Sequence, residues 1–276
     1  MAHRLIRSAI AASLLLSSGV LGLTAGARTV HAADLPVAPP VVATVHGWAG
    51  CYVGVNAGWM GGADRITTRP GPGGSLGPLS GLPPADAALL TSTYSSNQSA
   101  GFTGGGQTGC NWQRAGSPLV IGAELDFNGA RLRESVTAAY APVTLPVTGI
   151  DIPGRIEVVT KRLDWYSTIR GRLGLGWDRW LAYVTGGLAI THIRSSLDIP
   201  VAPFAGSDSR TRYGWTAGGG VEYAFASKWT VRLEYLFLDF GAYTYVAPHT
   251  IANARFWSAD VDAREHVLRA GLNYRF

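Results

Sequence analysis

The last ten residues of the chain alternate between a largely apolar face and a face that carries the polar side chains. One face of an extended strand would carry Leu268, Leu272 and Phe276, and the opposite face would carry Arg269 and Asn273. A period of two, with polar residues opposite apolar ones, predicts a β-strand whose two faces meet different surroundings. The chain therefore ends in a strand that separates a polar space from an apolar one.

Seven other segments have strand character, and each is close to the roughly 9–11 residues that a tilted strand needs to cross a bilayer. In the segment 229–238, for example, Trp229, Leu233 and Phe237 would lie on one face, and Arg232 and Glu234 on the other. The eight candidate strands are 50–60, 101–112, 119–132, 163–176, 180–192, 212–225, 229–238 and 265–276.

The segments between these candidate strands alternate between long and short. Long connections at 61–100, 133–162, 193–211 and 239–264 enclose short ones at 113–118, 177–179 and 226–228. Long outer loops and tight periplasmic turns are typical of outer-membrane barrels, and this order predicts that both termini are periplasmic. A soluble β-sandwich or a lipocalin-like barrel is the alternative. It does not explain this order, nor a charged content of 15%, when soluble domains have about 25%.

The N-terminus has the pattern of a secretory signal peptide. Arg4 and Arg7 form a basic region, residues 9–23 are apolar, and Val30-His31-Ala32 is similar to a signal-peptidase site. We predict a signal peptide over 1–32, a periplasmic Pro-rich lead-in over 33–48 and the barrel over 49–276. No later apolar run reaches the roughly 18 residues of a spanning helix, and without helices only a closed barrel can span a membrane. The expected fold is all-β, an eight-stranded antiparallel transmembrane β-barrel of the outer membrane.

Aromatic residues gather at the ends of the candidate strands, as they do where rings sit among lipid headgroups. We expect a periplasmic belt and an extracellular belt. The first would contain Trp112, Trp177, Trp180, Trp229, Tyr274 and Phe276, and the second Trp59, Phe102, Trp165 and Trp215.

The predicted inward faces carry charges of both signs. An eight-stranded barrel is filled by side chains, and buried charges must be paired. If the third and fourth candidate strands pair so that residue numbers sum to about 296, the pairing places opposite charges together. We therefore predict a structural ion-pair core, with a narrow gated conduit as the alternative. The predicted pairs are Glu124 with Arg172, Asp126 with Arg170, Glu222 with Arg232, and Glu234 with Arg269.

Two cysteines, Cys51 and Cys110, lie at the periplasmic ends of the first two candidate strands. Export permits a disulfide, and an antiparallel hairpin could place the two residues opposite each other. Cross-strand geometry is often poor for a disulfide, so both the bonded and the free state remain open. Two thiols without a neighbouring histidine do not suit zinc.

The sequence does not indicate an enzyme, a cofactor, a metal or a nucleic-acid partner. The net charge is +5, of which Arg4, Arg7 and Arg28 account for +3, so the remaining +2 forms no basic arm. The glycine strings at 101–109 and 171–176 lack phosphate-loop and dinucleotide patterns, and they predict close backbone approach. Lipid-modifying activity would need a histidine and a nucleophile at the outer border. The candidates are His192, His249 and His266 with Ser195, Ser196 or Ser258, and no G-x-S-x-G motif supports them.

Several motifs together resemble one family. They are the block 164–174, which begins Asp-Trp-Tyr-Ser-Thr, the block 180–189, the segments 50–58 and 218–223, the Arg232-Leu-Glu-Tyr strand, and the terminal Asn273-Tyr-Arg-Phe. The chain from about residue 48 to its end resembles the porin-family outer membrane immunogenic proteins of alphaproteobacteria. In that family an aromatic residue usually stands at the position of Cys51.

This resemblance implies an abundant, surface-exposed barrel that supports envelope integrity and is seen by host immunity. Some members are described as porins and others as haem binders. The terminal Tyr274 and Phe276 resemble the signal that the barrel assembly machinery reads. Outer-membrane lipid and lipopolysaccharide are the expected surroundings, and host factors are expected partners of the long loops. We therefore predict a structural and surface-interaction role. The alternatives are a small porin and a loop-mediated binder of haem or a host factor.

Overall fold

The computed structural model describes residues 46–62, 64–71, 82–96, 100–201, 204–249 and 256–276. The predicted signal peptide and most of the predicted lead-in lie outside the described residues. None of the described helices is long and apolar enough to cross a membrane.

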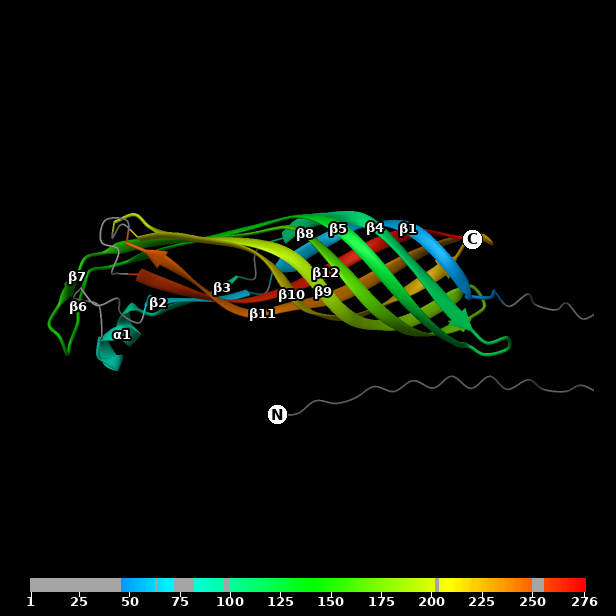
Figure 1. Cartoon of the computed structure of the whole chain (residues 1–276), viewed down its shortest axis with the longest axis horizontal. Coiled ribbons are helices and arrows are strands. Elements are labelled where there is room, and N and C mark those ends of the chain that lie inside the picture. Colours follow the sequence, from blue (N-terminus) through cyan, green and yellow to red (C-terminus); the bar gives the residue numbers. More distant parts are fainter. Residues whose placement is uncertain (1–45, 63, 72–81, 97–99, 202–203, 250–255) are drawn as a thin grey trace, which may run out of the picture. The chain divides into compact units, whose positions relative to one another are not determined.

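Eight antiparallel strands form a closed ring in which each strand pairs with its neighbours and β12 pairs with β1 (Figure 1). Closure leaves the ring without an exposed edge, so its backbone groups are satisfied within the ring. The predicted fold is confirmed. The strands are β1 (Gly50–Gly62), β4 (Ala100–Gln113), β5 (Leu119–Tyr140), β8 (Arg155–Trp177), β9 (Trp180–Ile199), β10 (Phe204–Ala224), β11 (Trp229–Pro248) and β12 (Phe256–Arg275).

The two ends of the ring differ, and we name them the turn end and the hairpin end. The turn end carries the short connections 114–118, 178–179 and 225–228, the start of β1 and the end of β12 (Figure 1). There the strands begin and end within one residue of the positions predicted from the sequence. At the hairpin end most of the strands run much farther than predicted.

The predicted loops 133–162, 193–211 and 239–264 are largely strand, which corrects the sequence interpretation. β5 pairs with β8 as far as Tyr140 and Arg155, and β9 pairs with β10 as far as Ile199 and Phe204. Register shifts occur at 129/132 in β5, 163/166 in β8 and 239/242 in β11. A bulge inserts a residue and reverses the inward and outward parity. Toward the hairpin end, the buried positions change from even to odd numbers in β8 and β11, whereas β5 keeps its alternation as far as Glu134.

Smaller elements complete the hairpin end. β2 (Asp64–Pro70) pairs with β12, and β3 (Ser92–Ser96) pairs with β2. The short helix α1 (Pro84–Leu90) has proline at its first position, where the missing N–H costs no hydrogen bond. β6 (Val143–Thr144) and β7 (Asp151–Ile152) form a two-stranded sheet at the tip of the β5–β8 hairpin. We call these elements and the extended strand ends the hairpin tower.

Glycines let the strands approach closely, as the sequence suggested. A Cβ atom on Gly105 would lie 2.0 Å from the carbonyl oxygen of Phe127 on β5. A Cβ atom on Gly174 of β8 would lie 2.7 Å from the carbonyl oxygen of Ala182 on β9. Any larger residue would push these strand pairs apart, so the glycine strings have a packing role in a narrow barrel.

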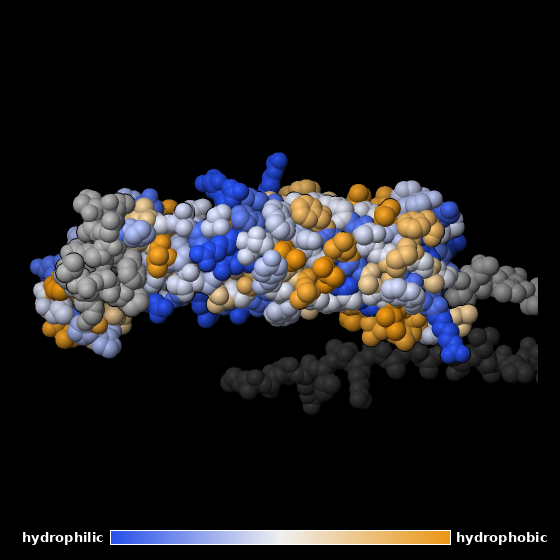
Figure 2. All heavy atoms as spheres, in the orientation of Figure 1, coloured by the Kyte–Doolittle hydropathy of each residue, from blue (hydrophilic) through white to orange (hydrophobic). Residues whose placement is uncertain are grey.

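The outer face of the ring is apolar. Val55, Val184 and Leu188 are each more than 60% exposed. Figure 2 shows apolar side chains gathered over the turn-end half of the visible face, with hydrophilic ones toward the middle of the molecule. The aromatic residues of the predicted periplasmic belt lie at the turn end, where Trp229 contacts Tyr274. In the predicted extracellular belt, Trp59 contacts Phe102 near the ends of β1 and β4. Trp165 and Trp215 lie in the middle of the extended β8 and β10, where Trp215 contacts Phe237.

The inside of the ring has two zones. Toward the turn end, the buried side chains are mainly polar and charged. From the level of Met60, Leu132 and Leu163 into the hairpin tower, a buried apolar cluster fills the interior and continues through Phe240 and Trp257. The sequence analysis did not predict this cluster, because its residues fall largely in segments assigned to loops.

Candidate functional site

Eight charged side chains from five strands meet inside the turn-end half of the ring. Each is at most 4% exposed. Four are arginines and four are carboxylates, so the formal charges of the set cancel. They are Glu124 and Asp126 on β5, Arg170 and Arg172 on β8, Glu222 on β10, Arg232 and Glu234 on β11, and Arg269 on β12.

Two arginines form the centre of this ion network. The guanidinium of Arg170 pairs with Glu124, with Asp126 at 2.9 Å and with Glu234 at 3.0 Å. The guanidinium of Arg269 pairs with Asp126 at 2.9 Å and with Glu234 at 2.6 Å. Each of these carboxylates therefore accepts from at least two arginines, which offsets the cost of removing the charges from water.

Neutral side chains complete the network. Tyr52 donates its hydroxyl hydrogen to Glu124, and Tyr183 donates to Glu234 at 2.9 Å. Gln107 donates to Asn273 at 2.6 Å, which in turn donates to Glu222 at 3.1 Å. Charged and neutral groups are thus linked across the full width of the ring, although Arg172 Nε, Arg232 Nε and Arg269 Nη1 have no hydrogen-bond partner among the described residues. Such linked polar networks rigidify a core.

One predicted register is wrong. Glu124 lies opposite Arg170, and Arg172 lies opposite Gly122, so the true pairing is shifted by two residues. An even shift keeps every side chain on its predicted face, which is why the inward set was predicted although the register between β5 and β8 was not. Arg172 instead pairs with Glu222 at 2.9 Å, and its guanidinium is 3.9 Å from Glu124. Asp126 lies opposite Thr168 and reaches Arg170 diagonally.

The other two predicted registers are present. Glu234 lies opposite Arg269, and the two form a direct ion pair. Glu222 lies opposite Arg232, but each of these two side chains forms its ion pairs with other residues. Arg232 pairs with Glu124 across the ring and contacts Glu234 at 3.6 Å.

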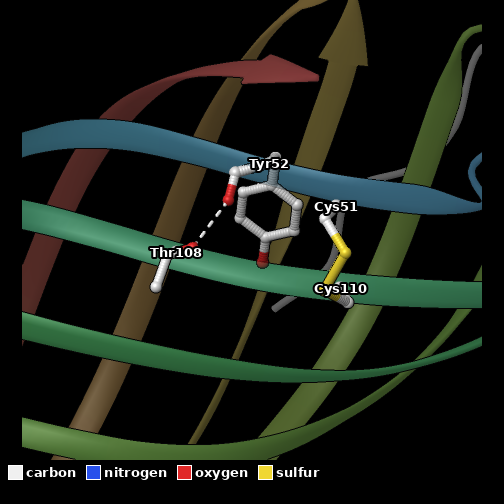
Figure 3. The surroundings of a disulfide bond; sticks show 4 residues. All are labelled: Cys51, Tyr52, Thr108 and Cys110. Carbon is white, nitrogen blue, oxygen red and sulfur yellow. Dashed lines mark hydrogen bonds between the residues drawn. A yellow bond between two sulfur atoms is a disulfide. The ribbon is translucent and has the colours of Figure 1, made fainter. Parts of the chain in front are cut away.

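Cys51 and Cys110 lie opposite each other on β1 and β4 and form a disulfide (Figure 3). In the same view Thr108 donates a hydrogen bond to the backbone carbonyl of Tyr52 at 3.0 Å. The disulfide closes the turn end of the first hairpin of the ring. The neighbouring Phe276 follows β12, donates its N–H to the carbonyl of Cys51 at 3.2 Å, and has an exposed ring.

A second buried charged cluster lies in the hairpin tower, and sequence reasoning missed it. The ammonium of Lys161 pairs with Asp64 and with Glu265 at 2.6 Å, and Glu134 lies beside them. Burial, followed by the nearby Asp64 carboxylate, raises the pKa of Glu134 to about 8. Asp64, Glu134 and Lys161 stood in segments assigned to loops, so no signal of burial was read from them.

Two of the histidines and one of the serines considered for catalysis have hydrogen-bond partners outside the candidate set. His192 contacts Ser209 at 3.1 Å, and His266 contacts Tyr235 at 2.6 Å. Ser195 is buried and contacts Tyr243 at 2.8 Å. Within the described ranges, no group of three or more His, Cys, Asp or Glu side chains is placed to hold a metal ion.

Residues 23–276 match the family model of the outer membrane protein beta-barrel domain. The chain belongs to this family. It is therefore a β-barrel of the bacterial outer membrane, and the part of the ring between its two aromatic belts is the spanning part. The ion network lies inside the spanning part, and Glu134 lies beyond it, in the hairpin tower.

The named proteins that this chain is similar to are also outer-membrane proteins. The 31 kDa outer-membrane immunogenic protein of Brucella melitensis is 32% identical over 259 residues, which cover 91% of this chain and 95% of that protein. The 22 kDa outer membrane protein of Rhizobium leguminosarum is 32% identical over 146 residues, 52% of this chain and 56% of that protein. Among solved structures, the outer membrane protease OmpT of Escherichia coli matches with a TM-score of 0.48 and 9% identity, covering 82% of this chain and 97% of that one.

Proposed function

We propose that the protein is a closed, non-conducting barrel that supports the outer membrane and displays the hairpin tower at the cell surface. The observation that carries this proposal is the filled interior. An ion network with no net charge occupies the spanning part, and an apolar cluster fills the space beyond it. A hydrated ion passing through would have to separate strong ion pairs and then enter an apolar region, and both steps are costly.

The orientation follows from the unequal ends. Short turns suit the periplasmic side and long hairpins the outer side, so the chain would begin and end in the periplasm. The exposed Phe276 ring at the end of β12 would then be accessible to the barrel assembly machinery, with Tyr274 beside it. We assign the chain no catalytic role.

The hairpin tower supports a surface role because its tip is held in place. Asp86 on α1 accepts hydrogen bonds from the backbone N–H groups of Val147 and Thr148 at 3.0 Å and from the Thr148 hydroxyl at 2.7 Å. A fixed tip presents a constant surface to antibodies or host molecules, in keeping with the name immunogenic that the Brucella relative carries.

The test is single-channel recording of the refolded full chain in planar bilayers, after heat-modifiable gel mobility has shown that the barrel is folded. We expect no discrete conductance steps from correctly folded protein. Reproducible steps, weakened by Arg172→Ala, would contradict the closed barrel and support the small porin instead. A larger barrel of known conductance in the same bilayer is the control for insertion.

A further inference from the structure

Three arginines stand side by side on the outer surface of the ring. Arg133 on β5 lies opposite Arg162 on β8, which lies opposite Arg194 on β9. All three are exposed. Like charges directly opposite each other on neighbouring strands repel and destabilise the sheet. We call these three residues the arginine row. An anion from outside the chain would reduce the repulsion between their charges.

The chain itself neutralises this row only in part. Arg194 is 3.5 Å from Asp164, and both of these side chains are largely exposed. Arg133 and Arg162 have no ion pair within the described part of the chain. The β11–β12 face contrasts with this one, because there Arg264 lies 3.4 Å from Asp239 and 3.1 Å from Asp262.

An apolar groove adjoins the arginine row. It has a volume of about 810 Å³, and its floor includes Ala57, Gly104 and Gly129, which lie in one cross-strand row. A Cβ atom on Gly129 would meet nothing closer than 3.8 Å. Arg131 and Asp164 line the same groove, and Arg131 precedes Arg133 by two residues. The groove therefore leads from the spanning part toward the arginine row.

Two aromatic pairs fix the height of the groove. Trp59 and Phe102 have ring centroids 6.5 Å apart, and Phe127 and Trp165 have centroids 5.5 Å apart. These pairs belong to the belt at the hairpin end, where headgroups meet acyl chains. The groove lies at this belt and extends from it toward the spanning part, and the arginine row lies on the side of the belt that faces the hairpin tower. One amphiphile with an anionic head and an apolar tail would occupy both.

We propose that the outer face formed by the groove on β1, β4 and β5 and by the arginine row on β5, β8 and β9 binds a phosphorylated glycolipid of the outer leaflet. Its phosphate would lie on the arginine row, since guanidinium groups match phosphate oxygens in bidentate geometry. One acyl chain would fill the groove, which in a bilayer has only lipid to fill it. The assignment to the outer leaflet rests on the proposed orientation of the barrel.

The experiment measures binding of diphosphoryl lipid A to the refolded full chain in neutral detergent micelles, by native mass spectrometry. The test variant combines Arg133→Ser, Arg162→Ser and Arg194→Ser. Its control combines Arg69→Ser and Arg264→Ser, which remove exposed arginines from the opposite face. We expect at least a tenfold loss of lipid A affinity in the test variant and less than a twofold change in the control. Equal affinity in test variant and wild type, or equal losses in test and control, would overturn the proposal.

A second variant examines the groove separately. Ala57→Leu with Gly129→Leu places side chains on its floor, and we expect several-fold weaker binding of lipid A with unchanged heat-modifiable mobility. Undiminished binding, or inorganic phosphate that competes as well as lipid A does, would remove the acyl chain from the proposal. Conductance and the orientation of the tower in intact cells are measured independently, so failure of the proposed function is distinguishable from failure of this site.

Discussion

Glu134→Gln should remove a pH dependence of stability that originates in the hairpin tower. Glu134 is 2% exposed and lies in a cluster of three carboxylates with a single ammonium group, that of Lys161, which pairs with the other two carboxylates, Asp64 and Glu265. If all four groups were ionised, the buried cluster would carry two uncompensated negative charges. Burial first, and the Asp64 carboxylate second, therefore raise the pKa of Glu134 from 4.5 to about 8.

The sign of the effect follows from proton binding. Because the folded state holds the Glu134 proton more tightly than the unfolded state does, stability is highest at low pH and falls between about pH 4.5 and about pH 8. Each unit of pKa shift is worth about 1.4 kcal/mol, so the full window amounts to roughly 5 kcal/mol as an upper bound. Sharing of the proton with neighbouring carboxylates reduces this to a few kcal/mol.

Glutamine imitates the protonated carboxyl and does not titrate. The variant should match the wild type near pH 5 and exceed its free energy of unfolding by a few kcal/mol at pH 9. The assay is denaturant unfolding in detergent at pH 5, 7 and 9, followed by tryptophan fluorescence and gel mobility. Asp198→Asn, which neutralises an exposed carboxylate on β9, is the control and should keep the wild-type slope. Identical slopes in wild type and Glu134→Gln would refute the reasoning.

Two further predictions concern the opposite ends of the barrel. Replacing Cys51 and Cys110 by serine opens a covalent loop between residues 59 positions apart. The loop-entropy relation predicts that the free energy of unfolding falls by about 4 kcal/mol. A denaturant midpoint equal to that of the oxidised wild type would contradict this. Asp86→Ala removes three hydrogen bonds to Val147 and Thr148, so limited proteolysis within 138–153 should become several-fold faster, and unchanged cleavage would show that the tip is held by other contacts. The same three bonds outweigh the effect of burial and lower the pKa of Asp86, so in wild type the tip should loosen only when the pH falls below the usual carboxyl range.

The turn-end half of the barrel was largely predictable from the sequence. Period-two alternation identified the strands and their faces, and tryptophans marked both belts. The inward charged residues followed from parity alone. The register between β5 and β8 did not, because an even shift leaves parity unchanged, and Glu124 was consequently assigned to Arg172 instead of Arg170. The predicted ion pairs of Asp126 with Arg170 and of Glu234 with Arg269 nevertheless form.

The hairpin tower was not predictable by the same reasoning. The irregularities in β8 and β11 reverse the alternation near the positions where the sequence reading stopped, although β5 keeps it. Beyond them the interior changes from polar to apolar, so residues such as Leu163 and Phe240 became buried inside the ring, where a spanning barrel is expected to be polar. Both the buried Lys161 cluster and the row formed by Arg133, Arg162 and Arg194 depend on these shifted registers.

The charge balance of the ion network constrains how this protein can change over generations. A substitution that removes one of its members leaves an opposite charge buried and unpaired, which costs about 3–5 kcal/mol. This is a large share of the stability of an ordinary domain. We therefore expect the four arginines and four carboxylates to be inherited as a set, and a tolerated change to come as a compensated pair. At the lipid-facing positions no buried charge depends on a partner, so one apolar residue can replace another by a single substitution. The inside of this barrel should therefore diverge in coordinated steps and its outside residue by residue.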